Sequence, residues 1–144
     1  MNYINLRPVT ESDVHIFYLH QSDEGSARMA GFQSRAEEAH IAHWHKIMAD
    51  AENILRTVVV DQIVAGNMVS FMMDGVREVG YWLGREFWGR GIASAALEQF
   101  LREVKTRSLY AHAVKTNPGS IRVMEKCGFI LQSEDAIEVT YRLD

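Results

Sequence analysis

The chain has 144 residues, and 47% of them are hydrophobic, so it is long enough for one domain with a buried core and too apolar for a disordered segment. Its 15 Lys and Arg residues against 19 Asp and Glu give a net charge of −4, which argues against a nucleic-acid partner and mildly favours cationic substrates. No run approaches the roughly eighteen apolar residues of a membrane span, and the N-terminus carries no hydrophobic signal segment. We therefore expect residues 1–144 to form a single cytoplasmic domain without a membrane contact.

The first third of the chain predicts one strand and two helices. Ile4–Pro8 has the pattern of a short strand, and Thr10 with Asp13 forms an acidic variant of the capping box that starts a helix reaching about residue 20. Ser34 with Glu37 forms a second capping box, which predicts a helix to about residue 50. The histidines of this part are expected on partly solvated helices rather than as metal ligands, so no metal site is predicted.

Residues 53–83 predict three antiparallel strands. Asn53–Asp61 and Ile63–Met73 are rich in β-branched and apolar residues, and Asp74-Gly75 supplies a hairpin turn into Val76–Leu83. The second of these strands carries three methionines that either fill irregular gaps in the core or shape the wall of an acceptor pocket, namely Met68, Met72 and Met73.

A glycine-rich turn, Trp88–Ser94, joins the last of these strands to an amphipathic helix. Gly89 and Gly91 have no β-carbon, so the backbone can turn tightly and present successive N–H groups to a ligand. Apolar residues recur at three-to-four spacing from Ile92 to Val104, which predicts a helix whose N-terminal donors and dipole favour an anion. The turn is therefore a candidate phosphate or pyrophosphate site.

The last third predicts a strand, a short helix and two final strands: Leu109–Lys115, Ser120–Cys127, Phe129–Glu134 and Ala136–Leu143. The full order is β-α-α-β-β-β-α-β-α-β-β, which predicts an α/β fold with a mixed, largely antiparallel sheet and helices on both faces. Cys127 is the only cysteine in the sequence, so no internal disulfide can form, and we expect it to be a small buried hydrophobe.

The glycine turn differs from the two common nucleotide-binding fingerprints. It lacks the Gly-Lys-Ser/Thr ending of a P-loop, and it lies past the middle of the chain, unlike the three-glycine dinucleotide motif. It resembles the pyrophosphate loop of the GCN5-related N-acetyltransferase (GNAT) superfamily, Gln/Arg-x-x-Gly-x-Gly/Ala, with matches at Gly91 and Ala93 and a departure at Trp88. Residues 117–129, Asn-Pro-Gly-Ser-Ile-Arg-Val-Met-Glu-Lys-Cys-Gly-Phe, resemble a later block of the same superfamily, Asn-x-x-Ser/Ala followed by Glu-Lys-x-Gly-Phe.

Within the superfamily, the sequence is most similar to the ribosomal-protein-alanine N-acetyltransferases. The similarity lies in the Trp-Gly-x-Gly-x-Ala turn, in Gly80–Leu83 before it, and in Leu6-Arg7-Pro8 with Asp13. The subgroup usually has Thr-Glu after the loop alanine, where this chain has Ser94-Ala95. The resemblance covers nearly the whole chain and implies a GNAT-type fold.

The resemblance also implies that acetyl-CoA is the co-substrate, lying in a gap where the strand before the turn and the strand after the helix diverge. It implies that strand backbone flanks the acetyl group and the pantetheine arm, that loop amides hold the pyrophosphate, and that Arg90 pairs with a phosphate. The implied cofactor-binding residues are Tyr81, Trp82, Leu83, Trp88, Gly89, Arg90, Gly91, Ile92, Ala93, Ser94, Asn117 and Ser120.

Acetylation of an amine needs a base, because most of the substrate arrives as an ammonium ion. In the related enzymes this base is a glutamate five residues before the motif asparagine, and the corresponding residue here is His112. A neutral imidazole accepts a proton at pH 7, directly or through water. Glu78 is the rival base, although strand parity places it on the opposite face from Tyr81.

The acid that protonates the departing thiolate is a separate question. Many superfamily members have a tyrosine seven residues after the asparagine, and here that residue is Met124, whose thioether cannot donate a proton. Ser120 is the candidate donor, and its alternative role is to cap the following helix. A thiolate leaves fairly well unaided, so a dedicated acid is not required.

Three functions stay open at this point. The first is an acetyl-CoA-dependent N-acetyltransferase acting on a protein N-terminus or a small amine. The second is a non-catalytic acetyl-CoA-binding module, indicated by Met124 and the missing glutamate, and the third is an unrelated nucleotide- or phosphate-binding domain. The sequence favours the first, and it identifies neither the acceptor nor whether the chain is a monomer or a homodimer.

Overall fold

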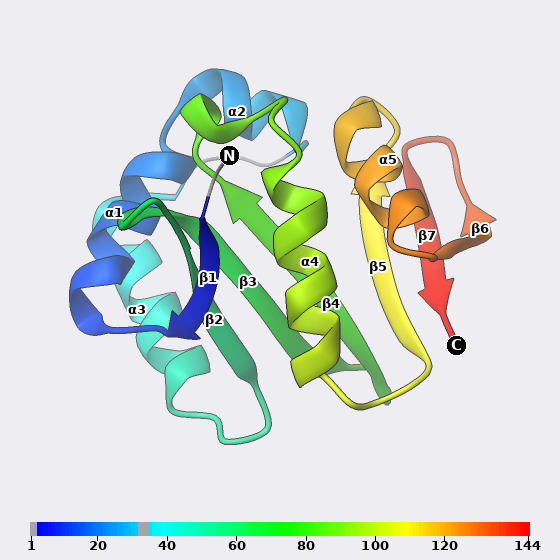
Figure 1. The fold of residues 1–144 in the computed structure, drawn as a ribbon, viewed down its shortest axis with the longest axis horizontal. Helices are drawn as coiled ribbons and strands as arrows, with labels where there is room; N and C mark the ends of the chain where they lie inside the picture. The colour runs from blue at the N-terminus through cyan, green and yellow to red at the C-terminus, as the bar shows by residue number, and fades with distance from the viewer. Residues whose placement is uncertain (1–2, 32–34) are drawn as a thin grey trace.

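A seven-stranded mixed sheet forms the centre of the molecule in the computed structural model, which describes residues 3–31 and 35–144 (Figure 1). The strand order is β1-β2-β3-β4-β5-β7-β6, and neighbouring strands are antiparallel except for the parallel pair β4 and β5. The strands are β1 (Ile4–Pro8), β2 (Ile54–Val60), β3 (Ile63–Met73), β4 (Val76–Leu83), β5 (Leu109–Val114), β6 (Ile130–Glu134) and β7 (Glu138–Leu143).

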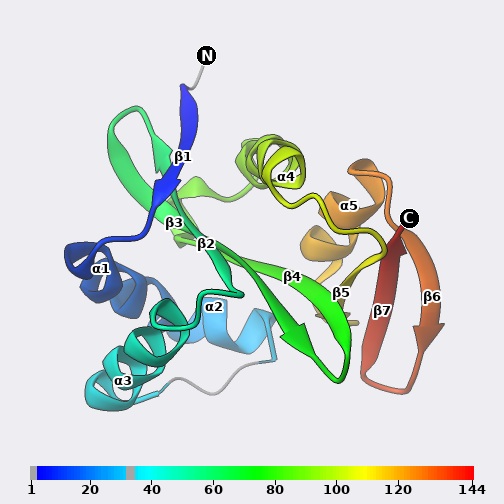
Figure 2. The same ribbon diagram turned by 90° about the horizontal axis from the view of Figure 1, so that it is seen from below.

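Helices cover both faces of the sheet, as Figure 2 shows. On one face lie α4 (Ile92–Glu103) and α5 (Pro118–Lys126), and on the other lie α1 (Glu11–Gln21), α2 (Glu24–Met29) and α3 (Glu37–Met48). The predicted α/β class, with helices on both faces of a largely antiparallel sheet, is confirmed.

Two apolar clusters hold these layers to the sheet. The larger lies between the sheet and the apolar stripe of α4, and the smaller joins α1 and α3 to the opposite face. Each large side chain that is fully buried stabilises the fold by about 1.5–3 kcal/mol. The buried stripe of α4 consists of Ile92, Ala96, Leu97 and Phe100, and the smaller cluster is built on Val14, Phe17 and Trp44.

Three strands match their predicted bounds, and most of the other bounds differ by one or two residues. β1, β3 and β4 begin and end at the predicted residues, because each is an apolar, β-branched run with turn residues at its ends. The order of elements differs by one short helix, α2, whose six residues are too few for a periodic signal and include Gly25. A turn of 3-10 helix, Arg85–Phe87, also precedes the glycine turn.

Two helix starts differ from the prediction. α3 begins at Glu37 with Ala36 at its N-cap, so the capping box assigned to Ser34 and Glu37 is wrong; Ser34 itself lies outside the described residues. Glu37 instead occupies the first helical position, where its charge complements the helix dipole. α5 begins at Pro118, because Asn117 Oδ1 accepts the backbone N–H of Ser120 at 3.2 Å and Asn117 is therefore the cap.

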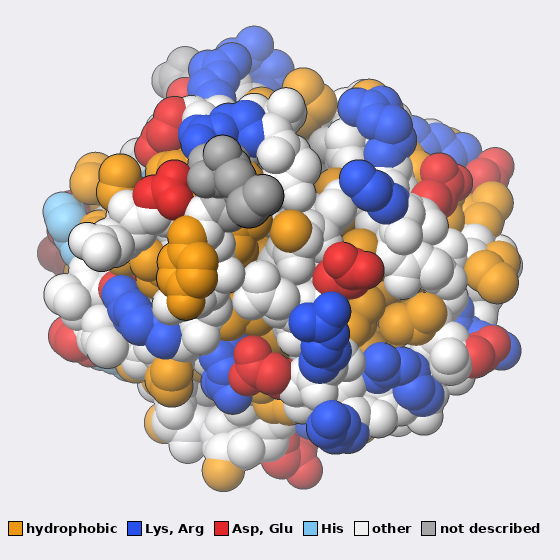
Figure 3. Space-filling view, in the orientation of Figure 1, with side chains coloured by type: hydrophobic (Ala, Val, Ile, Leu, Met, Phe, Trp, Pro, Cys, Tyr) orange, Lys and Arg blue, Asp and Glu red, His pale blue; other side chains and the backbone are white. Residues whose placement is uncertain are grey.

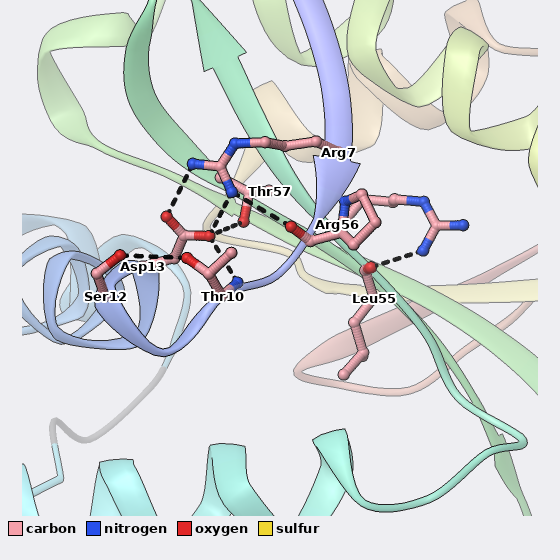
Figure 4. A network of polar contacts seen from close by, with 8 residues as sticks. Arg7, Thr10, Ser12, Asp13, Leu55, Arg56 and Thr57 are labelled. Atoms are coloured by element: carbon pink, nitrogen blue, oxygen red, sulfur yellow. Dashed lines mark hydrogen bonds and ion pairs between the residues drawn. The ribbon is translucent and has the colours of Figure 1, made fainter.

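Asp13 ties β1, α1 and β2 together (Figure 4). Arg7 donates two hydrogen bonds to its carboxylate at 2.7 and 3.0 Å, the Thr57 hydroxyl donates one at 2.7 Å, and the Thr10 backbone N–H donates one at 2.9 Å. Burial opposes ionisation, but these donors outweigh it and lower the pKa of Asp13 to about 2. The capping box predicted at Thr10 and Asp13 is confirmed, and its carboxylate also anchors the first strand.

β4 and β5 separate soon after they meet. They pair at Arg77–Leu109 and Glu78–Tyr110, and no further pair joins them in the part of the chain that the structure describes. β5 instead pairs along its whole length with β7. A gap therefore opens beside β4 from Val79 onward, on the strand that leads into the glycine turn.

Candidate active site

The gap between β4 and β5, called the slot below, contains a cavity of about 130 Å³. Its walls combine apolar side chains with an imidazole and two hydroxyl groups, and such convergent polar groups are a feature of small-molecule sites. The residues that line it are Val79, Gly80, Tyr81, Leu97, Ala111, His112, Ser120 and Met124.

The glycine turn forms a corner at the start of α4. Gly89 and Gly91 have positive φ angles of 71° and 74°, which glycine adopts without strain, and a β-carbon at either position would meet no described atom within 4 Å. The corner borders a cavity of about 330 Å³ that Arg122 and Lys126 of α5 also line. Figure 3 shows basic side chains over α5 on this face. Open backbone, a helix N-terminus and two cations together favour an anion.

A third cavity of about 320 Å³ joins the corner to the slot. It shares Gly89 and Ala93 with the corner cavity, and it shares Tyr81 and Ser120 with the slot. The three cavities adjoin one another at these shared residues, and together they are called the channel below. The structure thus brings together most of the residues predicted from the strand, the turn and the Asn-x-x-Ser motif: Tyr81, Trp82, Leu83, Trp88, Gly89, Gly91, Ile92, Ala93, Ser94, Asn117 and Ser120.

Two residues of the turn differ from the rest in their side-chain positions. The Arg90 guanidinium lies 5.7 Å from the centroid of the Phe87 ring and donates to the Glu86 carbonyl at 3.4 Å, and it is not among the residues that line the channel. The Ile92 side chain is 1% exposed in the core, so only its backbone is positioned to contact a ligand.

His112 lies between two carboxylates beside the slot. Its Nε2 is 3.1 Å from Oε2 of Glu78 on β4, and its Nδ1 is 3.4 Å from Oε1 of Glu138 and 3.0 Å from Oγ1 of Thr140 on β7. Glu78 is 9% exposed, whereas the His112 side chain is 34% exposed. The two residues predicted as rival bases are therefore in direct contact with each other.

Tyr81 and Ser120 face each other across the slot. The Tyr81 hydroxyl donates to Ser120 Oγ at 3.4 Å. Burial raises the pKa of Tyr81, and the contact with Ser120 offsets only part of that rise, so the phenol stays protonated at neutral pH. Met124, which is 2% exposed, lines the same cavity with its thioether. Ser120 does not cap α5, since Asn117 does, and its hydroxyl faces Tyr81 instead.

Comparison with known sequences assigns the chain to a family. The sequence model of the Acetyltransferase (GNAT) domain matches residues 4–130. The chain belongs to the GNAT acetyltransferase family. Two Bacillus subtilis proteins are similar to this GNAT chain: the probable N-acetyltransferase YjcK, at 28% identity over 71% of the chain, and YdaF, named as a candidate ribosomal N-acetyltransferase, at 29% identity over 65% of it. The alignments cover 55% of each relative, so the chain spans about half their length.

Solved structures share this GNAT fold. An acetyltransferase of the GNAT family from Bacillus anthracis aligns with a TM-score of 0.81 at 22% identity, over 97% of this chain and 93% of its own. The spermidine N-acetyltransferase of Vibrio cholerae, in complex with CoA and spermine, aligns at 0.80 and 16% identity over 96% and 92%. The aminoglycoside acetyltransferase AAC(6')-Ib, in complex with coenzyme A, aligns at 0.81 and 16% identity over 97% and 93%. At these identities the likeness concerns the fold.

Several residues of this GNAT site were not predicted from the sequence. Arg122 and Lys126 are four positions apart on α5 and so share a helix face, a spacing that was readable from the motif itself. Glu138 and Thr140 reach His112 from β7, and only the tertiary pairing of β5 with β7 reveals them. Residues of α2 also line the channel, and that helix was not predicted.

Other kinds of site have little support. Within the described ranges, no group of three or more His, Cys, Asp or Glu residues is placed to hold a metal ion, and no helix is both long and apolar enough to cross a bilayer. Cys127 is half-buried, with its Sγ 3.6 Å from the Ser94 carbonyl, and burial raises the pKa of its thiol. A protonated, half-buried thiol is a poor nucleophile.

Proposed function

We propose that this GNAT chain is an acetyl-CoA-dependent N-acetyltransferase that transfers the acetyl group directly to a primary amine. The observation that carries the proposal is the series of adjoining cavities from the glycine corner to the slot. A thioester carrier of this kind needs an anion site for its diphosphate and a narrow path for its arm that ends at reactive groups. The neighbours described as spermidine and aminoglycoside acetyltransferases support an amine acceptor, and either a protein N-terminus or a small amine fits this chemistry.

The residues along the channel fit acetyl-CoA as co-substrate. We assign the diphosphate to the backbone amides from Gly89 to Ser94, with Arg122 and Lys126 as counter-charges. The pantetheine arm then follows β4 along Tyr81–Leu83, with Asn117 on the opposite wall. Acetyl-CoA supplies the activated acyl group, and its thioester lies in the slot beside Tyr81 and Ser120.

The chain's own proton acceptor is the pair Glu78 and His112. An ammonium group must lose a proton before its nitrogen can attack the carbonyl carbon of the thioester. Because Nε2 of His112 and Oε2 of Glu78 are 3.1 Å apart, an amine can reach both groups at one place, and we assign proton acceptance to the pair rather than to one residue. Thr140 and Glu138 hold the imidazole ring from the other side.

Two hydroxyl groups serve the departing thiolate. As the new C–N bond forms and the C–S bond breaks, the sulfur takes up the negative charge and then a proton. Ser120 and Tyr81 both line the slot, and the Tyr81 hydroxyl is protonated at neutral pH, so we assign proton donation to this pair. Met124, at the position of the superfamily tyrosine, has no proton to give.

Calorimetric titration with acetyl-CoA, followed by an assay of CoA release over a panel of amines, tests the proposal. We expect saturable heat and CoA release with at least one amine. Gly91→Ala is expected to remove the heat, because a β-carbon at φ 74° is strained and lies in the anion site. Gly75→Ala is the matched control: it has φ 81° and open surroundings, but it lies in the hairpin turn between β3 and β4.

Each other outcome selects a different function. An absence of heat with acetyl-CoA overturns the proposal. Heat without turnover across the amine panel supports a non-catalytic binding module, the function that Met124 and the missing glutamate favour. Thermal protection by ATP or NAD, but not by CoA, supports a nucleotide-binding domain of unrelated chemistry.

A further inference from the structure

A second large cavity lies on the other face of the sheet, between α3 and strands β2 to β4. We call it the groove. Its volume is about 560 Å³, which is in the range of small-molecule sites. It shares Tyr81 and Trp82 with the channel, so the two cavities meet at β4. Resting on the proposed function, we propose that the groove binds the acceptor and that this acceptor is a primary monoamine on an aromatic body.

The cross-strand register shows how an amine in the groove reaches the base. The pairs Asn67–Trp82, Val69–Gly80 and Phe71–Glu78 place these residues on one face of the sheet. Gly80 therefore lies between Trp82, which lines the groove, and Glu78, which contacts His112. A β-carbon at Gly80 would meet only Val69 Cγ2 at 3.8 Å among the described atoms, so the sheet surface is open at this point. Gly80 also lines the slot, which completes the route.

The walls of the groove fit a large apolar body. Trp44 and Phe71 line it from α3 and β3, and Trp82 lines it from β4. Two methionines at the end of β3 also line it, and they are 44% and 50% exposed, which leaves two adaptable thioethers uncovered. Aromatic rings favour stacked or edge-on contact with another ring, so an aromatic body gains most here. Of the two roles open for Met72 and Met73, the structure supports the wall of a pocket, whereas Met68 is a core residue.

The charges along the groove disfavour a second cation. Arg35 and Lys46 line it, and Asp50 carries the one carboxylate among the described lining residues. Burial, and after it the charges of Arg35 and Lys46, lower the pKa of His43, which lines the groove beside them. A polyamine or an aminoglycoside would bring further ammonium groups beside these positive charges. The net charge of −4 favours cationic substrates overall, but the local charges decide the acceptor.

Three amines with the same reacting group test the assignment: phenethylamine, butylamine and butane-1,4-diamine. We expect kcat/KM for phenethylamine to exceed that for butylamine by about tenfold, because only the ring fills the aromatic wall. The diamine is expected to fall below butylamine by about threefold, because of its second charge. A preference for the diamine, for spermidine or for an alanine-led peptide overturns the inference while leaving the proposed function intact.

Variants in the groove sharpen this test. Phe71→Ala is expected to lower kcat/KM for phenethylamine about tenfold, mainly through KM, and to change butylamine little. Ile63→Ala is the control, since it removes an exposed side chain from the same strand outside the groove. Lys46→Glu is expected to raise kcat/KM for the diamine above that for butylamine. Lys105→Glu makes the same charge change outside the groove and is expected to leave the ratio of the two unchanged. Equal effects within either pair overturn the inference.

A binding measurement separates this inference from the proposed function. Trp44 and Trp82 line the groove, so phenethylamine added to the CoA complex should change the intrinsic fluorescence, and Phe71→Ala should weaken that binding about tenfold. If phenethylamine binds in this way but no amine is acetylated, the groove assignment stands and the proposed function fails. If phenethylamine neither binds nor reacts, the groove assignment fails.

Discussion

Asp13 and Glu78 are both buried carboxylates in the sheet region, yet their surroundings differ. Asp13 accepts from Arg7, Thr10 and Thr57, and none of these donors changes its charge near neutral pH (Figure 4). Glu78 instead contacts the imidazole of His112, with its Oε2 3.1 Å from Nε2 of the ring. A carboxylate held by fixed donors stabilises the fold, whereas one that meets an imidazole beside a cavity is placed for chemistry.

The position of each carboxylate in the sheet explains the difference. Asp13 lies under the continuous antiparallel pairing of β1 with β2, where neighbouring elements can supply donors on every side. Glu78 lies at the last pair before β4 and β5 separate, so one side of it faces a gap rather than another strand. A stable scaffold and a candidate site are therefore built from the same chemical group, a carboxylate, according to whether the sheet continues.

The largest effect is expected from matched substitutions of these two residues. Asp13→Asn places an amide group against the Arg7 donors and should cost about 3 kcal/mol of unfolding free energy. Glu78→Gln should cost less than about 1 kcal/mol, because a neutral imidazole can accept from the new amide. Urea unfolding followed by circular dichroism measures both. Equal losses would show that the two carboxylates play the same role.

Activity is expected to show the opposite pattern. Glu78→Gln and His112→Asn should each lower kcat/KM by about 100-fold without lowering the melting temperature much, because either change removes the shared proton acceptor. The double variant should lose little more than either single variant, since the pair acts as a unit. Steady-state kinetics on purified, folded variants measures this. Two independent, multiplying losses would mean that the residues act separately.

The sequence predicted those parts of the molecule that depend on local patterns. Thr10 with Asp13 marked a true helix start, and Gly89 with Gly91 marked the corner, because capping and positive φ are requirements of single residues. β3 was predicted to its exact ends, since its turns are specified by the residues beside it.

The contacts between distant strands could not be predicted in this way. The alternation of side chains along a strand predicts the face of β4 on which Glu78 lies. The residue that Glu78 contacts across the sheet depends on where the parallel pairing of β4 with β5 begins. The sequence therefore presents His112 and Glu78 as rival bases, although their nearest side-chain atoms are 3.1 Å apart. The family resemblance implies Arg90 as the phosphate partner, whereas the basic side chains that line the corner, Arg122 and Lys126, come from the packing of α5 beside the turn.

The loss of unfolding free energy at low pH should depend on Asp13. Its pKa is about 2 in the folded protein and about 3.9 in an unfolded chain, so the unfolded state takes up the proton first as the pH falls. The stabilisation is complete above about pH 5 and is lost as the pH falls from about 4 to 2, a change of about 2 kcal/mol. Urea unfolding across this range should show the loss in the native chain. In Asp13→Asn the unfolding free energy should change little across this pH range. If it falls as steeply as in the native chain, other groups cause the loss of stability at low pH.

The smallest effects are expected from substitutions of the two β7 residues that contact His112. Glu138 Oε1 is 3.4 Å from Nδ1 and its side chain is 45% exposed, so water can replace most of its influence, and Glu138→Gln should lower kcat/KM by about twofold. Thr140 Oγ1 is closer, at 3.0 Å, and Thr140→Val keeps the shape while removing the hydrogen bond that orients the ring, so a loss of about fivefold is expected. Kinetics at several salt concentrations distinguishes them, because only the Glu138 effect should shrink as salt screens its charge. A larger loss at Glu138 than at Thr140 would mean that charge, rather than ring orientation, is what β7 contributes to the base.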